Sequence, residues 1–308
     1  MKFSEMPYER PDLPAVLRQY DAVLDKLRNA ASPEEAVTAF EEHEALSTQV
    51  ETAAVICSIR HTIDTNDSFY EKENDFFDEN SPLVNQKILD VYQALLDSPH
   101  REALAKRFGS ILFDKLEVDA KSAIPEIIPL MQEENALETA YQKLYASAAI
   151  SFEGKTLNLS QLSLYKQDPD RAVRRAAYEA EGNWFDAHRE EFDTLYSRLV
   201  KNRTEQAKKM GYENYLPLGY IRMKRLGYGP KEVAAYRDQI ARDLVPLVVR
   251  IKKNQADRIG VDHLRFYDDL FSFPDKNPTP KGSPEEILRA GVEMVMEEVM
   301  KAAGNDMA

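Results

Sequence analysis

The chain has 308 residues, and its 43% hydrophobic content is enough to build a sizeable core over about two domains' worth of sequence. Its 53 acidic and 40 basic side chains give a formal net charge of -13, which disfavours nucleic acid and anionic membrane surfaces as partners. Because Cys57 is the only cysteine and no signal-like or membrane-spanning apolar run is found, a cytoplasmic protein without internal disulfides is expected.

Apolar residues recur at intervals of three and four along most of the chain, and glycine is sparse, so the fold is predicted to be nearly all-α. The first helix is expected from near Asp12 to beyond Leu27. Ser32, followed by a proline and by Glu35, has the pattern of an N-terminal cap and predicts a second helix that reaches about His61.

A third helix is predicted after Asp67, whose side chain can cap it. Its interruption is expected around Asn80-Ser81-Pro82, because proline disfavours the helical conformation in the residue before it. The helix is expected to resume through Leu95. Shorter pieces follow, and then another long helix that includes Tyr145.

From Ile150 to Leu159 the apolar period changes from helical to two, which predicts a short β-hairpin that turns at Glu153-Gly154. One helix of about forty residues is then expected from Asp168 to Gly211. At about 1.5 Å per residue such a helix would span roughly 60 Å and would need an elongated scaffold.

Two further helices are expected, over about Glu213 to Arg225 and Pro230 to Ile259, before a proline-rich loop at Phe273–Pro280. A final helix begins after Ser283. The fold class is therefore all-α, an elongated multi-helix lobe with one short hairpin. We expect an N-terminal helical region at 1–148 and a second region, the hairpin and the helices after it, at 149–308.

The five histidines do not form a helical metal-binding pair of the H-E-x-x-H type. His43 opens such a pattern, but Ser47 stands where the second imidazole would be required. Cys57, His61 and Asp64 fall on one helical face, which is compatible with a metal or thiol-imidazole site and equally with a buried thiol beside a solvated helix edge. No serine elbow, P-loop or dinucleotide fingerprint occurs, so no catalytic or metal-binding residue is assigned.

A basic and aromatic set of side chains is the candidate binding surface. Its members are Arg171, Arg174, Arg175, Tyr178, Tyr220, Arg222 and Tyr228. They could hold an acidic ligand or the carboxylate of a peptide. The alternative is structural, with Arg171 and Arg175 paired to neighbouring acids such as Glu179. Trp184 shares the apolar stripe of this region and is predicted to belong to a core rather than to a ligand platform.

Several segments resemble, in the same order, the oligoendopeptidase F branch of the thimet-oligopeptidase-like zinc metallopeptidases. They are ISFEGKTLNLSQL, DPDRAVRRAAYEAEG, LVKNRTEQAKKMGYENYLPLGYIRMKRLGY and DHLRFYDDLFSFPDKNPTPKGSPEEIL. The resemblance extends from about Ile150 to Leu288.

The resemblance implies an almost wholly helical body that encloses a long channel for short unfolded peptides. It also implies zinc, which the family holds with the two histidines of H-E-x-x-H and a later glutamate. Those positions are expected beyond the end of this chain, which would be truncated before the zinc-binding segment, so none is assigned to a residue here. The candidate Arg and Tyr side chains are expected to line the channel.

Two interpretations of function follow from these observations. The first is an N-terminal portion of a zinc metalloendopeptidase, a lobe of the channel wall that is inactive alone. The second is a non-catalytic helical module that binds peptides or acts as a scaffold. A chain of the first kind is expected to expose an apolar face of the final helix, and a stand-alone module is expected to melt cooperatively. That face consists of Leu288, Val292, Val295 and Val299.

Overall fold

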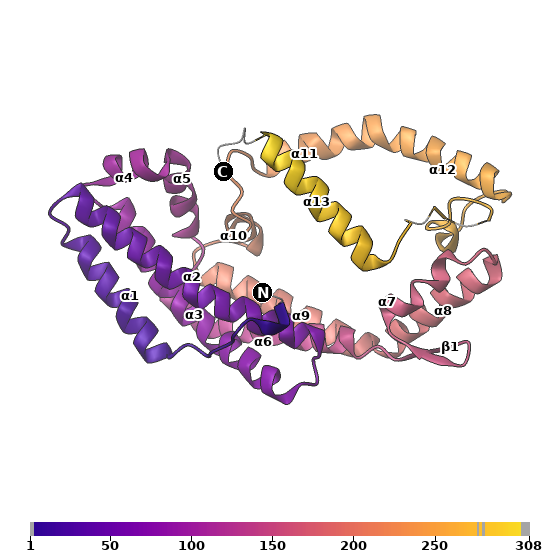
Figure 1. Cartoon of the computed structure of the whole chain (residues 1–308), viewed down its shortest axis with the longest axis horizontal. Coiled ribbons are helices and arrows are strands. Elements are labelled where there is room, and N and C mark those ends of the chain that lie inside the picture. Colours follow the sequence, from indigo (N-terminus) through magenta and orange to yellow (C-terminus); the bar gives the residue numbers. More distant parts are fainter. Residues whose placement is uncertain (1–2, 276, 279–280, 303–308) are drawn as a thin grey trace. The chain divides into compact units, whose positions relative to one another are not determined.

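The computed structural model describes residues 3–275, 277–278 and 281–302. For residues 300–302 it describes the backbone only. The fold is all-α with one short antiparallel hairpin, which confirms the predicted class (Figure 1). The α-helices are α1 (Leu13–Arg28), α2 (Pro33–Ile63), α3 (Ser68–Leu96), α4 (Arg101–Phe108), α5 (Ser110–Asp119), α6 (Ile128–Ala146), α7 (Leu159–Leu162), α8 (Arg171–Ala187), α9 (Arg189–Lys209), α10 (Tyr215–Arg222), α11 (Pro230–Gln239), α12 (Val245–Ile259) and α13 (Pro284–Ala302). The strands are β1 (Ile150–Phe152) and β2 (Lys155–Leu157).

The chain forms two compact units. The first unit contains the residues up to Ala148 together with Trp184–Ile240, and the second contains Ala149–Asn183 together with the described residues from Ala241 onward. One border between the units therefore falls after Ala148. The division of the sequence into domains 1–148 and 149–308 stays a prediction.

The first three helices begin where their capping residues predict. Oδ1 of Asp12 accepts from the backbone N–H of Ala15 at 3.2 Å, and Oγ of Ser32 accepts from that of Glu35 at 3.2 Å. Oδ1 of Asp67 accepts from the backbone N–H of Phe69 at 2.9 Å. Each cap satisfies a donor that the first helical turn leaves unpaired, so local sequence is sufficient to place these helix starts.

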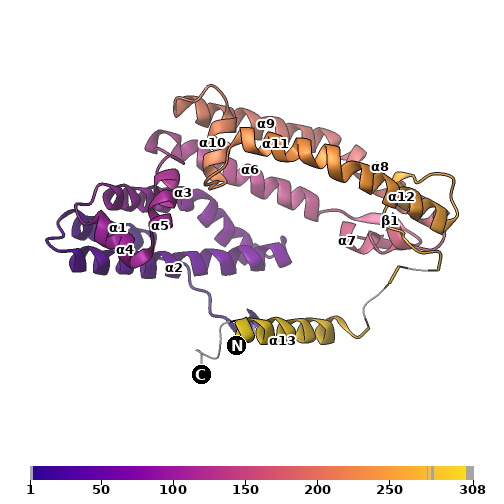
Figure 2. The same cartoon turned by 90° about the horizontal axis from the view of Figure 1, so that it is seen from above.

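The core of the first unit lies between α1, α2 and α3, which run side by side in Figures 1 and 2. α4 and α5 close one end of this bundle through Leu104 and Phe113. The fully or almost fully buried apolar side chains of the bundle are Tyr20, Leu27, Ala36, Ala39, Phe40, Val91, Leu95, Leu104, Phe113 and Leu116. Burial of such side chains is the main stabilising contribution to a helical bundle.

The interruption expected at Pro82 is wrong, because α3 continues through that residue. Proline has no N–H to donate to the carbonyl of Asp78, four residues earlier. That carbonyl instead accepts from Nδ2 of Asn135 at 2.9 Å, and the next carbonyl, of Glu79, accepts from Nε2 of Gln132 at 2.7 Å. Asn135 of α6 thus takes the place of the missing helical donor, and Gln132 adds a second hydrogen bond beside it. The local sequence of α3 cannot show these contacts.

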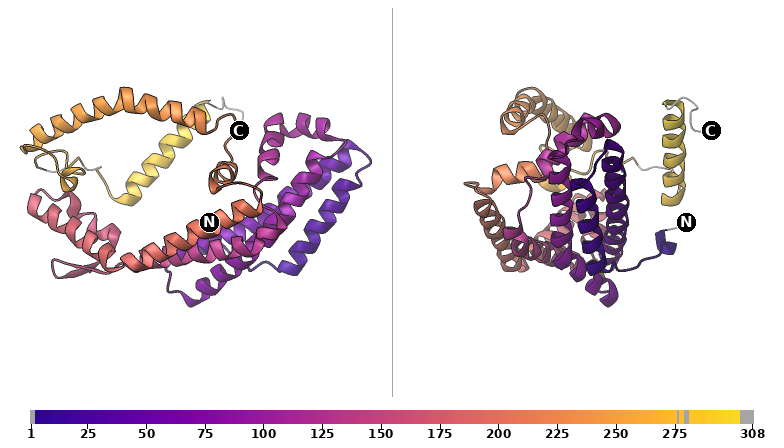
Figure 3. Two further views of the ribbon diagram at one scale, coloured as in Figure 1. Left: turned by 180° about the vertical axis from the view of Figure 1, so that it is seen from behind. Right: turned by 90° about the vertical axis from the view of Figure 1, so that its left-hand side faces the viewer.

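Helices α6 and α9 pack against each other in the first unit, as Figures 2 and 3 show. Their contacts run in antiparallel register: the ring of Phe192 lies 5.8 Å from that of Tyr141, whereas Asn202, further along α9, donates to the carbonyl of Leu130 at 3.0 Å. The packing of α9 against α6 therefore explains why the later segment 184–240 belongs to the first unit.

The single helix expected from Asp168 to Gly211 is wrong, since His188 separates α8 from α9. Nδ1 of His188 lies 2.8 Å from the carbonyl oxygen of Trp184, the same atom to which its backbone N–H donates at 3.2 Å. A side chain that competes for this carbonyl disturbs the regular helical ladder. Trp184 is half-buried and packs against Phe185 and Phe192, so it takes part in an aromatic cluster but is not a fully buried core residue.

The helix expected from Pro230 to Ile259 is also divided. A π-helical turn at Ile240–Leu244 separates α11 from α12. Pro246 follows this turn in the first turn of α12 and has no N–H, which explains why the regular bonding pattern is lost just before it.

The hairpin of the second unit turns at the predicted residues, but its second strand ends at Leu157, and Leu159, which was expected in the hairpin, begins α7. Ile150 pairs with Leu157, and Phe152 pairs with Lys155. Glu153 and Gly154 have φ values of 47 and 74 degrees, as a two-residue hairpin turn of this hand requires. Of the proline-rich loop that follows α12, Lys276, Thr279 and Pro280 lie outside the described residues.

Candidate functional site

The sequence candidates at the start of α8 are held by one buried carboxylate, that of Asp268. Arg171 donates through Nε and Nη2 to its two oxygens at 3.0 and 2.7 Å, and Arg174 donates through Nη2 to Oδ1 at 2.9 Å. Burial would raise the pKa of Asp268, but these groups and the backbone N–H of Arg265 lower it to about 2. The two arginines therefore fasten α8 to the turn Phe266–Asp268.

Arg174 is almost completely buried, with 2% of its side chain exposed. Its Nη1 donates to the carbonyls of Asp168 and Pro169 at 2.7 and 3.0 Å. Its guanidinium lies 4.1 Å from the centroid of the Phe271 ring. Every one of these contacts is internal to the second unit, so the residue joins the start of α8 to the segment around Asp268.

Arg175 and Tyr178 lie on the same helix but have different neighbours. Arg175 forms an exposed ion pair with Glu179 at 2.7 Å, which confirms the structural alternative for this residue. The Tyr178 ring meets Phe266 edge to face at 5.5 Å, and Nζ of Lys166 lies 4.7 Å from its centroid. That these side chains line a channel remains a prediction.

The remaining candidates belong to the first unit, where Arg222 connects three segments. Its Nη1 donates to Oε2 of Glu134 at 3.2 Å, its Nη2 to Oε1 of Gln206 at 2.5 Å, and its Nε to the carbonyl of Ser122 at 3.2 Å. All three nitrogens of the guanidinium are thus occupied. Arg222 is consequently a cross-link between α10, α6 and α9.

Tyr220 and Tyr228 flank a different arginine. The guanidinium of Arg225 lies 4.8 Å from the centroid of the Tyr220 ring and 5.6 Å from that of Tyr228. Tyr228 is half exposed. The seven candidates therefore divide between the units, with Arg171, Arg174, Arg175 and Tyr178 in the second and the other three in the first.

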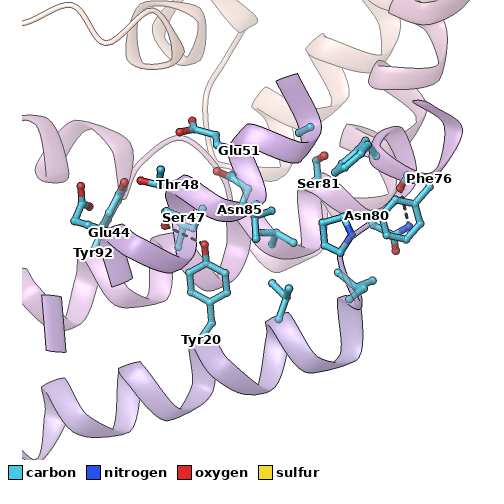
Figure 4. Close-up of a pocket in the computed structure, with 18 residues that line it drawn as sticks. Tyr20, Glu44, Ser47, Thr48, Glu51, Phe76, Asn80, Ser81, Asn85 and Tyr92 are labelled. Atoms are coloured by element: carbon cyan, nitrogen blue, oxygen red, sulfur yellow. Dashed lines mark hydrogen bonds between the residues drawn. The ribbon is translucent and has the colours of Figure 1, made fainter. Parts of the chain in front are cut away.

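A cavity of about 290 Å³ lies between α1, α2 and α3 in the first unit (Figure 4). Its apolar wall includes Val16, Val84 and Ile88. Two carboxylates of α2, Glu44 and Glu51, stand at its exposed side. We call this space, with its apolar wall and two carboxylates, the first cavity.

A second cavity of about 490 Å³ adjoins the first, and the two share Glu51, Ser81, Asn85, Ile88 and Tyr92. Its other charged lining residues are Asp119, Glu134, Glu138, Arg222 and Lys224. Arg222 is therefore a sequence candidate that lines one of these two cavities.

Both cations of the second cavity are already paired. Arg222 bonds Glu134, and Nζ of Lys224 lies 3.0 Å from Oδ2 of Asp119. Burial and the neighbouring charge of Glu134 raise the pKa of Glu138, although Arg203 acts in the opposite direction. An excess of negative charge is thus characteristic of both cavities.

The sequence did not single out Glu44, Glu51 or Tyr92. The two acids are seven residues apart, with Ser47 and Thr48 between them, so they form a polar stripe along one face of α2. Such a stripe is usually a solvated face, and only the packing of α1 and α3 shows that it borders a cavity.

No group of three or more histidine, cysteine or acidic side chains suited to a metal ion exists within the described residues. Cys57 and His61 are buried, whereas Asp64 is exposed at the end of α2. Burial raises the pKa of the Cys57 thiol to about 11, which favours the interpretation of a buried thiol over a reactive one. Cys57, His61 and Asp64 therefore do not fit the zinc site of two histidines and one glutamate that the family resemblance implies.

Two family models match the chain in order. Residues 3–123 match the peptidase M3 N-terminal domain, and residues 164–304 match peptidase family M3. The chain belongs to peptidase family M3. No curated protein matches it.

Several solved structures are similar to the chain over nearly its whole length. A structure assigned as oligoendopeptidase F is 43% identical with a TM-score of 0.93, and PZ peptidase A with inhibitor 2 is 42% identical with a TM-score of 0.93. Each alignment covers 96% of this chain and 53% of the other. A structure assigned as oligoendopeptidase F from Bacillus anthracis str. Ames is 39% identical, with a TM-score of 0.92, and the alignment covers 96% of this chain and 55% of that one. The chain thus spans about half the length of these relatives.

Proposed function

We propose that the chain forms the N-terminal part of a zinc metalloendopeptidase that hydrolyses short unfolded peptides. The observation that carries this proposal is the match to the oligoendopeptidase F structure, at 43% identity across 96% of the chain. Identity at this level over nearly the whole chain supports a shared role as well as a shared fold. The two M3 family models, matched in their order along the chain, support it independently.

The described residues supply no zinc site, so the metal ligands of such an enzyme would come from elsewhere in its fold. We propose that this chain alone neither activates water on zinc nor hydrolyses peptides. Its own part would be to form the wall of the peptide channel. The seven Arg and Tyr candidates are proposed to line or support that wall, with Arg174 and Arg222 acting as internal cross-links.

An intracellular location is part of the same proposal. The single cysteine is a buried free thiol, as expected of a protein from a reducing compartment. The described residues contain no helix with the length and apolar character that crossing a bilayer would need.

The alternative, a non-catalytic helical module, predicts a molecule whose apolar faces are covered. Four apolar side chains of α13 are instead between 51 and 70% exposed, as the first interpretation anticipates. They are Leu288, Val292, Val295 and Val299. An exposed apolar face of this kind is typical of a surface that packs against further protein, so it favours the first interpretation.

Metal analysis tests the proposal. After purification with zinc present and dialysis into metal-free buffer, we expect the chain to retain far less than one equivalent of zinc, because it lacks a three-ligand group. An oligoendopeptidase F of full length serves as the positive control. One tightly bound zinc per chain would contradict the proposal.

A further inference from the structure

The first cavity combines an apolar interior with negative charge at its exposed side. Val16, Val84 and Ile88 contribute to the interior, and the almost fully buried Tyr20 also lines it (Figure 4). The hydroxyl of Tyr20 is already bonded to Oγ of Ser47 at 3.0 Å. A volume of about 290 Å³ exceeds that of one long side chain, so the cavity has room for a ligand group with an apolar stem.

The two carboxylates at this cavity lack a cationic partner. Within the described residues, neither Glu44 nor Glu51 forms an ion pair with a lysine or an arginine. Burial, together with the charge of Glu51, raises the pKa of Glu44. A positive charge placed between the two carboxylates would relieve this repulsion.

A buried imidazole lies next to one of these two carboxylates. His43 is fully buried, and neither of its ring nitrogens has a hydrogen-bond partner among the described residues. Its Nε2 lies 3.7 Å from Oε1 of Glu44, so the ring edge faces a carboxylate that lines the cavity. Unpaired buried polar groups are rare in proteins, and this one lies behind Glu44, although His43 does not itself line the cavity.

The aromatic wall of the cavity is also suited to cations. Phe76 lines the cavity and already has a cation of the chain against its ring, because the guanidinium of Arg10, held by Glu73, lies 4.6 Å from the ring centroid. The ring of Tyr92 lines the cavity as well, and its hydroxyl has no protein partner in the described part of the chain. Aromatic faces attract ammonium and guanidinium groups.

We propose that the first cavity binds the basic side chain of a peptide, with the apolar stem of a lysine or arginine against Val84 and Ile88 and its cationic head between Glu44 and Glu51. This inference rests on the proposed peptidase function for the peptide nature of the ligand. A free diamine also has a cationic group on an apolar stem, so the test must distinguish it from a peptide side chain.

The test compares two capped pentapeptides by calorimetry with the 308-residue chain, one with a central lysine and one with glutamine at that position. The lysine peptide is expected to bind about tenfold more tightly, and this ratio is expected to shrink in high salt. In the double variant Glu44→Gln and Glu51→Gln, the ratio of the two peptide affinities is expected to fall below about twofold. Cadaverine is titrated in parallel as a free diamine.

The matched control is Glu41→Gln with Glu42→Gln, which removes the same charge from the same helix. These two acids form exposed ion pairs with Arg107 and Lys26 and do not line the cavity, so the tenfold ratio is expected to persist. Ala54→Leu adds volume to the cavity wall, and it is expected to weaken both peptides.

Equal affinity for the two peptides, or an unchanged ratio in the Glu44 and Glu51 variant, would overturn the inference. Binding of cadaverine without binding of the lysine peptide would overturn the assignment to a peptide. Because these measurements need no turnover, such results leave the peptidase proposal intact. Tight zinc binding by the chain would overturn that proposal and leave the cavity result standing.

Discussion

Asp268→Ala is expected to lower the free energy of unfolding of the second unit by about 3–5 kcal/mol, because it leaves the buried guanidinium of Arg174 without its counter-charge. It also removes the acceptor that joins Arg171 on α8 to the turn Phe266–Asp268. Hydrogen exchange of the backbone amides of α8 and of this turn measures the effect within the unit. Protection there is expected to fall sharply, while protection in α1 to α3 is retained.

Arg175→Ala is the control for this prediction. Arg175 lies one residue from Arg174, but its ion pair with Glu179 is exposed on both sides, and its loss is expected to cost less than about 0.5 kcal/mol. Equal loss of protection in the Asp268 and Arg175 variants would show that the buried network does not hold the unit together.

His43→Phe is expected to remove an acid-induced loss of stability from the first unit. Burial lowers the pKa of His43 to about 4, against 6.5 for the ordinary side chain. Between these values the unfolded chain binds a proton that the folded chain does not. The stabilising effect of the neutral ring is therefore complete above pH 6.5 and declines as pH falls towards 4, by about 3 kcal/mol in total.

Urea unfolding at pH 7 and at pH 4.5 measures this linkage. The groups that face the imidazole are Glu44, Tyr20, Tyr92 and Phe40, and phenylalanine keeps the stacking on Phe40 while removing the titrating nitrogens. Other carboxylates titrate in both proteins, so the informative quantity is the difference between wild type and variant. A difference that does not change with pH would contradict the assignment.

Local sequence was sufficient for those elements whose determinants are themselves local. The caps Asp12, Ser32 and Asp67 define the first three helix starts because each satisfies a backbone donor within three residues of itself. The Glu153-Gly154 turn likewise fixes the hairpin register, since its positive φ values match the twist of the strands.

The wrong predictions concern residues at which side-chain hydrogen bonds decide the backbone conformation more than helix propensity does. Pro82 was expected to break α3, but Asn135, more than fifty residues away, takes the place of its missing hydrogen-bond donor, and Gln132 supplies a further bond to the next carbonyl. His188 was expected to lie within one long helix, but its ring competes for the carbonyl of Trp184. Propensity alone does not contain either interaction.

The candidate site shows the same limit. Arg171 and Arg174 were proposed as part of a binding surface, but their partner Asp268 is more than ninety residues away in sequence and could not be identified without the fold. The cavity acids Glu44 and Glu51 resemble any solvated helix face until α1 and α3 are placed beside them. Family resemblance supplied the class of protein, and packing supplied the individual contacts.

Hydrolysis of a quenched fluorescent peptide by the purified chain, with added zinc and with or without a chelator, tests the central claim most directly. That claim is that this chain provides part of the M3 peptidase fold without its metal chemistry. We predict no hydrolysis above the rate in buffer, while an oligoendopeptidase F of full length cleaves the same peptide. Chelator-sensitive hydrolysis by the chain alone would contradict the claim.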